Sequence, residues 1–332
     1  MEVERILKKY KITEQELERI LKEIETAPPK QVVTFDDYFT DKTQIGVISD
    51  SHIGHKEFDE PFWKHMVEQM KRNNVNRIYH VGDVLEGMSG REGNIYELSH
   101  IGFSKQIKYA SKLLKMLEGI KIFGLNGNHD DWYMKKNNGG VNVGEELETR
   151  VKEYKNLGSM EANIKLRPNV TMKLFHPADG TAYATSYKLQ KMVESFSGGE
   201  KPEILLEGHY HKALYMFIRN VHAFECGTMC GQTPFMRGKK IPAHKGFWIL
   251  DIEMGDGGIG AISPKFFAGY KWKMELEIIC LGQFLHNCKC EIDRDPNHKP
   301  NNLDCPKYIP VTVRYFNAVA VGEIKANEKY RR

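Results

Sequence analysis

Apolar runs alternate with amphipathic segments over the first half of the chain. The runs at 44–49, 77–82 and 120–125 are typical of buried strands, whereas 59–74 and 100–118 repeat apolar residues at helical spacing. This strand–helix–strand–helix–strand order predicts a partly parallel sheet with helices on its faces.

After residue 160 the pattern changes to short strands with few helices between them. The segments are "NVTMKLFH", "EILLEGH", "ALYMFIR", "VHAFECG" and "GFWILDIE", with one helix expected near 186–197. Such a series predicts a second, largely antiparallel sheet. Two sheets with helices outside them would form a layered α/β sandwich, and we expect this main domain to span residues 40–272.

The two ends of the chain differ from this domain. Residues 1–30 predict a helical hairpin, in which Thr13 and Glu16 form a capping box and "APPK" ends the second helix. Packing on the main domain is the favoured role for this hairpin, and binding of nucleic acid or a partner is the alternative. Residues 274–332 are rich in Pro, Asn and Asp and predict a small appended module or tail.

The C-terminal segment also contains cysteines and histidines, but not at a regular zinc-finger spacing. It has Cys288, Cys290 and Cys305 together with His286 and His298, and only one Cys-x-Cys. A structural zinc needs four nitrogen or sulfur ligands in a tetrahedron. Incidental cysteines are therefore favoured over a zinc site.

Composition narrows the class of protein. The 332 residues carry 48 Lys and Arg against 44 Asp and Glu, so the net charge of +4 gives no global signature of a nucleic-acid binder. No apolar run approaches the ~20 residues that span a bilayer, and the N-terminus lacks a signal-peptide core. Six cysteines in a chain of this length fit a reducing compartment. We therefore expect a cytoplasmic protein without membrane contact. The sequence is compatible with a monomer and with a homo-oligomer.

Polar groups that can bind metals follow five of the predicted strands. They occur in "DSHIGH", "GD", "NGNHDD", "FHP" and "GHYH". Because the carboxyl ends of strands meet at the ligand crevice of open α/β sheets, these groups should lie close together. The residues concerned are Asp50, His52, Asp83, the triplet Asn128, His129 and Asp130, His176, His209 and His211.

The residue types and their spacing indicate a two-metal centre. On an extended segment, Asp50 and His52 would point the same way, and so would His209 and His211. Imidazole and carboxylate ligands suit Mn, Fe, Zn, Co or Ni better than Ca or Mg. Asp83 is alone at its strand end and is the candidate bridge between two cations about 3.5–4 Å apart, which would clamp a phosphoryl oxygen and activate a water. A single Asp-x-His is more often a surface turn, but the joint pattern favours the metal centre.

The ordered blocks "DSH", "GD", "GNHD", the strand-end His176 and "GHYH" resemble the signature of the calcineurin-like metallophosphoesterases over residues 50–211. The resemblance implies a four-layer α/β/β/α sandwich of two mixed sheets. It implies one metal held by Asp50, His52 and His211, a second held by Asn128, His176 and His209, and Asp83 as their bridge.

The resemblance also implies the proton-transfer groups. His129 is similar to the general acid of the family, and Asp130 is expected to hold its tautomer through a hydrogen bond. Two departures concern the surroundings of the ligands. Glu86 stands where many members have Asp or His three residues after the bridge, and the block around His176 lacks the usual preceding Gly.

The expected reaction is hydrolysis of a phosphoester with two divalent cations, of which Mn is favoured and Ni, Co, Fe and Zn are alternatives. The 228–246 loop carries Arg237, Lys239 and Lys240 with Phe235 among them, which suits a nucleic-acid backbone as well as it suits a solvated loop. We therefore expect a phosphodiesterase that acts on DNA or RNA. The alternatives are a phosphomonoesterase or pyrophosphohydrolase for a small metabolite, and an inactive metal-containing module that binds nucleic acid or a partner.

Overall fold

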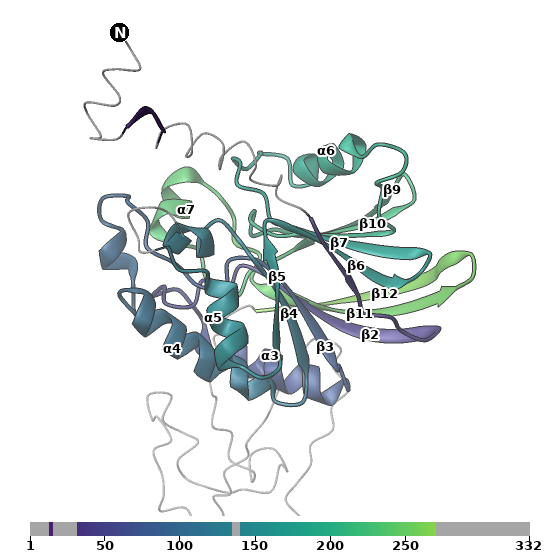
Figure 1. Cartoon of the computed structure of the whole chain (residues 1–332), viewed down its shortest axis with the longest axis horizontal. Helices are drawn as coiled ribbons and strands as arrows, with labels where there is room; N and C mark the ends of the chain where they lie inside the picture. The colour runs from purple at the N-terminus through teal and green to yellow at the C-terminus, as the bar shows by residue number, and fades with distance from the viewer. Residues whose placement is uncertain (1–12, 16–31, 135–139, 270–332) are drawn as a thin grey trace, which may run out of the picture. The chain divides into compact units, whose positions relative to one another are not determined.

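A computed structural model describes residues 13–15, 32–134 and 140–269 (Figure 1). Apart from residues 13–15, the predicted hairpin at 1–30 lies outside the described residues, and so does the predicted module at 274–332 with its cysteines. Within the described ranges, no helix is long and apolar enough to cross a membrane.

The first sheet has six strands and carries the predicted parallel core. Its strands, in spatial order, are β12 (Gly258–Ala268), β11 (Gly246–Gly255), β2 (Lys42–Ile48), β3 (Arg77–Val81), β4 (Lys121–Asn126) and β5 (Tyr154–Ser159). The four strands from β2 to β5 are parallel, and β11 and β12 add an antiparallel pair at the β2 edge. The segment "GFWILDIE" therefore belongs to this sheet, and its predicted place in the second sheet is wrong.

The second sheet is mixed. In spatial order it contains β1 (Val33–Asp36), β6 (Glu161–Arg167), β7 (Val170–Phe175), β8 (Ile204–Glu207), β10 (Val221–Cys226) and β9 (Ala213–Ile218). Three of its five pairings are parallel, so the prediction of a largely antiparallel sheet is also wrong. One reason is the segment between β7 and β8, which contains the helix α6 (Tyr187–Ser195) and supplies the crossover that parallel neighbours require.

Helices cover the outer face of each sheet (Figure 1). The helices α3 (Glu60–Arg72), α4 (Phe103–Leu114) and α5 (Val143–Arg150) pack on the first sheet, and α6 packs on the second. A separate apolar cluster fills the space between the sheets, with residues such as Val47, Leu125 and Leu206. The predicted four-layer α/β/β/α sandwich is confirmed.

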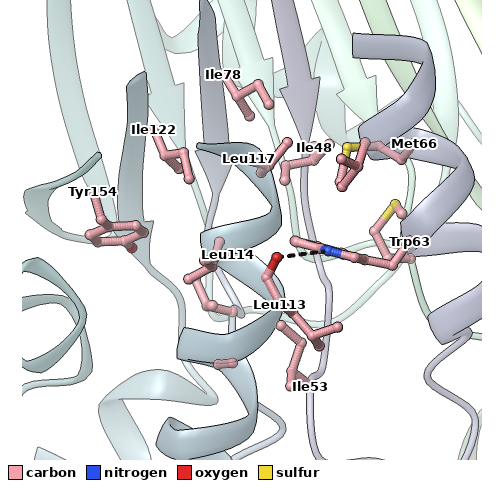
Figure 2. Packing of buried hydrophobic residues seen from close by; sticks show 14 of the residues in the cluster. Ile48, Ile53, Trp63, Met66, Ile78, Leu113, Leu114, Leu117, Ile122 and Tyr154 are labelled. Atoms are coloured by element: carbon pink, nitrogen blue, oxygen red, sulfur yellow. Dashed lines mark hydrogen bonds between the residues drawn. The ribbon is translucent and has the colours of Figure 1, made fainter. Parts of the chain in front are cut away.

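An apolar layer packs the helices α3 and α4 against the first sheet and holds its strands in position. Figure 2 shows Trp63 of α3 and Leu113 of α4 packed with Ile48 and Ile78 of the sheet. The Trp63 indole N–H donates to the Leu113 carbonyl at 3.2 Å, which satisfies a polar group that is otherwise buried. α3 and α4 are thereby joined to each other as well as to the strands whose carboxyl ends carry the predicted ligands.

Candidate metal centre

The predicted ligands come together through left-handed turns rather than extended segments. Asp50, His52, Asp83, His209 and His211 all have positive φ values, between 48° and 77°. The extended geometry predicted for the Asp-x-His and His-x-His pairs is therefore wrong. Residues other than Gly adopt this conformation at an energetic cost, and such residues cluster at functional sites. The turns aim the side chains that follow β2, β3 and β8 at one point.

Glycines leave room for this convergence at two positions. A Cβ atom on Gly82, where φ is +87°, would lie 2.2 Å from Nδ1 of His176. A Cβ atom on Gly127 would lie 2.2 Å from Oδ1 of Asp83 and 2.7 Å from Nε2 of His176. All three separations are far below van der Waals contact, so each of the two positions requires a residue without a side chain.

The first group of ligands consists of Asp50, His52 and His211, whose ligand atoms all lie within 4.8 Å of one another. Nε2 of His211 is 3.3 Å from Oδ1 of Asp50 and 2.9 Å from Nε2 of His52. The Asp50 carboxylate is held by the backbone N–H of His209, which donates to both of its oxygens at 3.1 and 3.0 Å.

The second group consists of Asp83, His176 and His209, again within 4.8 Å. Nε2 of His176 lies 3.2 Å from Oδ2 of Asp83 and 3.3 Å from Oδ1 of Asn128. Oδ2 of Asp83 is also 3.8 Å from Nε2 of His52, so this carboxylate lies between the two groups, as expected for a bridge. The structure thus brings all seven predicted ligands together.

The hydrogen bonds of three histidines test whether the groups fit metal ions. Nδ1 of His176 donates to the Val81 carbonyl at 2.6 Å, and Nε2 of His209 donates to the Asp179 carbonyl at 2.7 Å. Nδ1 of His52 lies 2.9 Å from Oε2 of Glu86. Because carbonyl and carboxylate oxygens accept, the other ring nitrogen of each histidine is the one that can bind a cation once it is unprotonated.

This arrangement, with one nitrogen fixed by an acceptor, is typical of histidines that bind metals. Together with carboxylate oxygens it forms a donor set suited to divalent transition metals. The residues present therefore fit two divalent cations.

Electrostatics keep the two aspartates ionised. Burial opposes the charged form of Asp50, but His211 and His176 outweigh it and lower the pKa of Asp50 to about 2. Burial likewise opposes ionisation of Asp83, but His176 and His129 bring its pKa well below the usual value. Negative charge is thus available at both groups at neutral pH.

His129 lies at the edge of the centre, with its ring centroid 4.5 Å from that of His52. Its Nδ1 donates to the backbone carbonyl of Glu86 at 2.8 Å, and its backbone N–H donates to Oδ1 of Asp83 at 2.8 Å. Burial alone would lower the pKa of His129, but the carboxylates of Asp83 and Glu86 raise it to about 9. The two carboxylates thus favour the protonated ring, in which Nε2 carries the proton that is not tied to the protein backbone.

Asp130 does not orient His129 in the predicted way. Its carboxylate accepts hydrogen bonds from the backbone N–H groups of Val84, Leu85 and Gly127 at 2.9–3.0 Å. The acceptor that fixes the His129 ring is instead the Glu86 carbonyl. Asp130 joins the loop after β4 to the loop after β3, and so positions His129 and Asp83 through the backbone.

A cavity of about 420 Å³ opens in front of the centre. His52, Asp83, Asn128, His129, His209 and His211 line its floor, and Arg91, Trp132 and Phe235 are among the residues of its walls. The predicted substrate residues Arg237, Lys239 and Lys240 are not among the described lining residues. They lie on α7 (Pro234–Lys239) and at its end, where the Arg237 guanidinium is 3.7 Å from the carboxylate of Glu57. The part of their loop that reaches the cavity is Thr233, Phe235, Met236 and Ile241.

The roles of three residues near the centre were not predicted from the sequence, although Glu86 was noted as a departure from the family. Glu86 contacts two of the histidines, and Arg91 lies on the cavity wall. Trp132 packs on His129 with ring centroids 3.9 Å apart and ring planes tilted by 31°. Trp132 follows His129 by one helical turn, a spacing that could have drawn attention to it. The sequence around Arg91 carries no comparable signal.

The comparison with protein families agrees with this geometry. The model of the calcineurin-like phosphoesterase superfamily domain matches residues 44–254, which include all seven predicted ligands and His129. The chain belongs to this superfamily. It is accordingly a metal-dependent phosphoesterase by family, and its His and Asp groups are able to hold divalent metals.

Several solved structures are similar to this phosphoesterase at low sequence identity. An archaeal phosphodiesterase is 17% identical with a TM-score of 0.40, and the match covers 68% of this chain and all of that one. Vps29 from Entamoeba histolytica, complexed with zinc, is 14% identical with a TM-score of 0.36, covering 68% and 99% of the two chains. Yfce, a phosphoesterase from E. coli, is 13% identical with a TM-score of 0.37, covering 67% and 98%. Curated proteins gave no significant match.

Proposed function

We propose that this phosphoesterase is a phosphodiesterase that hydrolyses DNA or RNA at the metal centre. When bound, two divalent cations, Mn in our proposal, would neutralise phosphoryl charge and activate water. The residues that would hold them are Asp50, His52, Asp83, Asn128, His176, His209 and His211. The observation that carries the proposal is the composition of the cavity wall.

The charges of the wall favour a diester over a monoester. Among the described lining residues, Arg91 is the one Lys or Arg, and its guanidinium is paired with Glu97 at 2.6 Å. A phosphomonoester carries a charge of about −1.5 to −2 at neutral pH, whereas each diester group carries −1. A monoester pocket would be expected to add fixed Lys or Arg side chains for the second charge. Apart from His129 at the edge of the centre, the described lining residues include no cationic side chain that is unpaired.

The aromatic residues of the wall favour a substrate that carries nucleobases. Trp132, Tyr210 and Phe235 line the cavity, and the Phe235 side chain is 47% exposed. The guanidinium of Arg91 lies 5.3 Å from the centre of the Phe235 ring, so a flat apolar surface stands beside a cation. Stacking of a base on such a ring contributes about 1–3 kcal/mol and tolerates every base.

His129 supports an active enzyme rather than a binding module. Its Nδ1 is held by the Glu86 carbonyl, so the protonated Nε2 is the group able to reach the oxygen that leaves phosphorus. The carboxylates of Asp83 and Glu86 raise the pKa of His129 and so favour this proton, which a more basic alkoxide can accept. A centre that only binds nucleic acid has no chemical use for such a group.

A substrate panel tests the proposal. Bis-p-nitrophenyl phosphate and p-nitrophenyl phosphate would be compared first, followed by labelled single- and double-stranded DNA and RNA, each with Mn, Ni, Co, Zn and Mg. We expect the diester to have the higher kcat/KM and at least one nucleic acid to be cleaved with Mn. Hydrolysis of the monoester without cleavage of any nucleic acid would refute the proposal.

A pair of variants tests the role of the wall. Phe235→Ala is expected to raise KM for nucleic acid about tenfold, because one stacking surface is lost. Phe217 on β9 is 59% exposed and is not among the described residues that line the cavity, so Phe217→Ala is the matched control.

A further inference from the structure

The exposed face of α4 consists almost entirely of lysines. Lys105, Lys108 and Lys112 of α4 and Lys115, the residue that caps its C-terminal end, are exposed. They follow one another at spacings of three, four and three residues, which places them on one side of the helix. The remaining exposed residue of α4 is Ser104. An open groove of about 1080 Å³ runs along this face, and all four lysines line it.

α4 differs from the other helices that pack on the same sheet. Among the described residues, the charges of its lysines are not balanced by ion pairs. α3 has the ion pairs Lys64–Glu60 and Arg72–Glu68, and α5 has Arg150–Glu146, all at spacing i to i+4. α4 contains no acidic residue. In the described part of the chain none of its lysines forms an ion pair.

Glu60, an acid near the lysine face, is already engaged by other residues. Lys112 interacts electrostatically with Glu60 and, after Lys64 and Tyr109, contributes to the lowered pKa of its carboxyl group. The Glu60 carboxylate, however, also accepts a hydrogen bond from Tyr109 at 2.6 Å and pairs with Lys64 at 2.8 Å. Lysines three and four residues apart repel one another, so the helix carries an unfavourable charge pattern in the free protein. A polyanion would relieve this repulsion.

The helix that carries the lysine face is attached to a loop of the metal centre through its buried side, at Gln106. Gln106, in the first turn of α4, accepts a hydrogen bond from the backbone N–H of Gly87 at 2.9 Å and donates to its carbonyl at 3.0 Å. Gly87 follows Glu86, which contacts His52 and His129. The N-terminal end of α4 is therefore fixed to the loop of the centre, and Lys115 lies about 15 Å further along the helix from Lys105.

We infer that the lysine face of α4 binds the phosphate backbone of the nucleic-acid substrate outside the cavity. The inference rests on the proposed function. About 15 Å corresponds to the axial length of four nucleotides of one strand, which matches four lysines to about four phosphates. A membrane surface is a poorer partner, since membrane-binding helices expose large apolar residues beside their lysines and α4 exposes none.

Two charge-matched variants test the inference. The first is K105Q/K108Q/K112Q/K115Q, in which Gln keeps a high helix propensity. The control is K42Q/K191Q/K201Q/K265Q, which removes the same charge from β2, α6, the segment before β8, and β12. Both are made in the full chain, and binding to labelled nucleic acid is measured in a His129→Asn background so that the probe is not consumed.

The salt dependence of binding gives the sharpest measurement. Each phosphate contact contributes about 0.9 to the slope of log K against log salt for duplex DNA and about 0.7 for single strands. In the α4 variant, the magnitude of this slope is expected to decrease by about 3 to 4. Its affinity for nucleic acid near 0.1 M salt is expected to be at least tenfold lower than that of the parent. With His129 restored, its turnover of bis-p-nitrophenyl phosphate should equal that of the parent, because the small diester needs only the cavity.

Three results would overturn the inference, and they are distinguishable from one another. Equal slopes of log K against log salt for the two variants would show that the lysine face does not bind nucleic acid. This result would not affect the proposed function. A loss of binding only to vesicles that contain phosphatidylserine would assign the face to a membrane instead. If the parent cleaves bis-p-nitrophenyl phosphate but neither binds nor cleaves any nucleic acid, the proposed function fails and the inference fails with it.

Discussion

Glu86 touches two histidines with different roles, and its replacement should disturb both. Its Oε2 is 2.9 Å from Nδ1 of His52 and 3.6 Å from Nδ1 of His129. Glu86→Gln keeps the size of the side chain but removes its charge. A hydrogen bond to a charged group contributes about 1.5–3 kcal/mol, and 1.36 kcal/mol in a barrier is tenfold in rate. We therefore expect kcat/KM for bis-p-nitrophenyl phosphate to fall about 10- to 100-fold.

The same variant should change the pH profile. The carboxylates of Asp83 and Glu86 raise the pKa of His129 to about 9 against the effect of burial. An acid with a raised pKa is protonated below that value, so activity is lost as pH rises through it. Without the charge of Glu86 this pKa falls, and the alkaline limb of kcat/KM should move to lower pH.

A neighbouring carboxylate serves as the control. Glu97 lines the same cavity, but it pairs with Arg91 at 2.6 Å and is not one of the ligands or their partners in the centre. Glu97→Gln should keep both the rate and the alkaline limb. Metal content of each variant is measured in parallel. Parental kcat/KM in Glu86→Gln, or a lower rate with an unmoved alkaline limb, would refute the dual role of Glu86.

Three further predictions concern single residues. His129→Asn should reduce turnover about 10²- to 10⁴-fold while metal content holds, and parental turnover would disprove its role as the acid. Asp130→Asn replaces one of two acceptor oxygens that bind three amides, so thermal unfolding should show a loss of about 1–3 kcal/mol; an unchanged Tm would contradict this. Burial raises the pKa of Glu225 from 4.5 to about 7, and both of its oxygens lack a described partner. Its proton therefore stabilises the fold below pH 4.5, and this contribution is lost as pH rises to about 7. Denaturant unfolding should show the stability of Glu225→Gln rising relative to the parent by roughly 2–3 kcal/mol from pH 5 to pH 8, and a constant difference would be evidence against it.

The convergence of the predicted ligands could be anticipated from the sequence, because each follows an apolar run that is buried as a strand. The pairing partners of the strands could not. The alternation in "GFWILDIE" indicates that the strand is buried, but not that it lies beside β2. Partners depend on contacts between distant segments, for which a single strand carries no local signal.

The local geometry of the centre was also beyond sequence reasoning. The spacing of Asp50 and His52 is the same in an extended segment and in a left-handed turn, although the side chains point differently. The hydrogen bonds of Asp130 depend on the backbone of the loop after β3, which lies more than forty residues earlier in the chain. The family resemblance supplied the identity of the ligands, but it did not supply these partners.

The predicted ligands of the centre come from both sheets of the sandwich. Asp50, His52 and Asp83 follow strands of the first sheet, whereas His176, His209 and His211 follow strands of the second. Cations held between these two sets of residues would link the two sheets, which otherwise pack through the apolar layer between them. A ligand that binds only the folded state adds about 2.7 kcal/mol of stability at a hundred times its Kd. Removal of the metal with a chelator should therefore lower the free energy of unfolding of the two-sheet domain, in addition to removing the cations that catalysis needs.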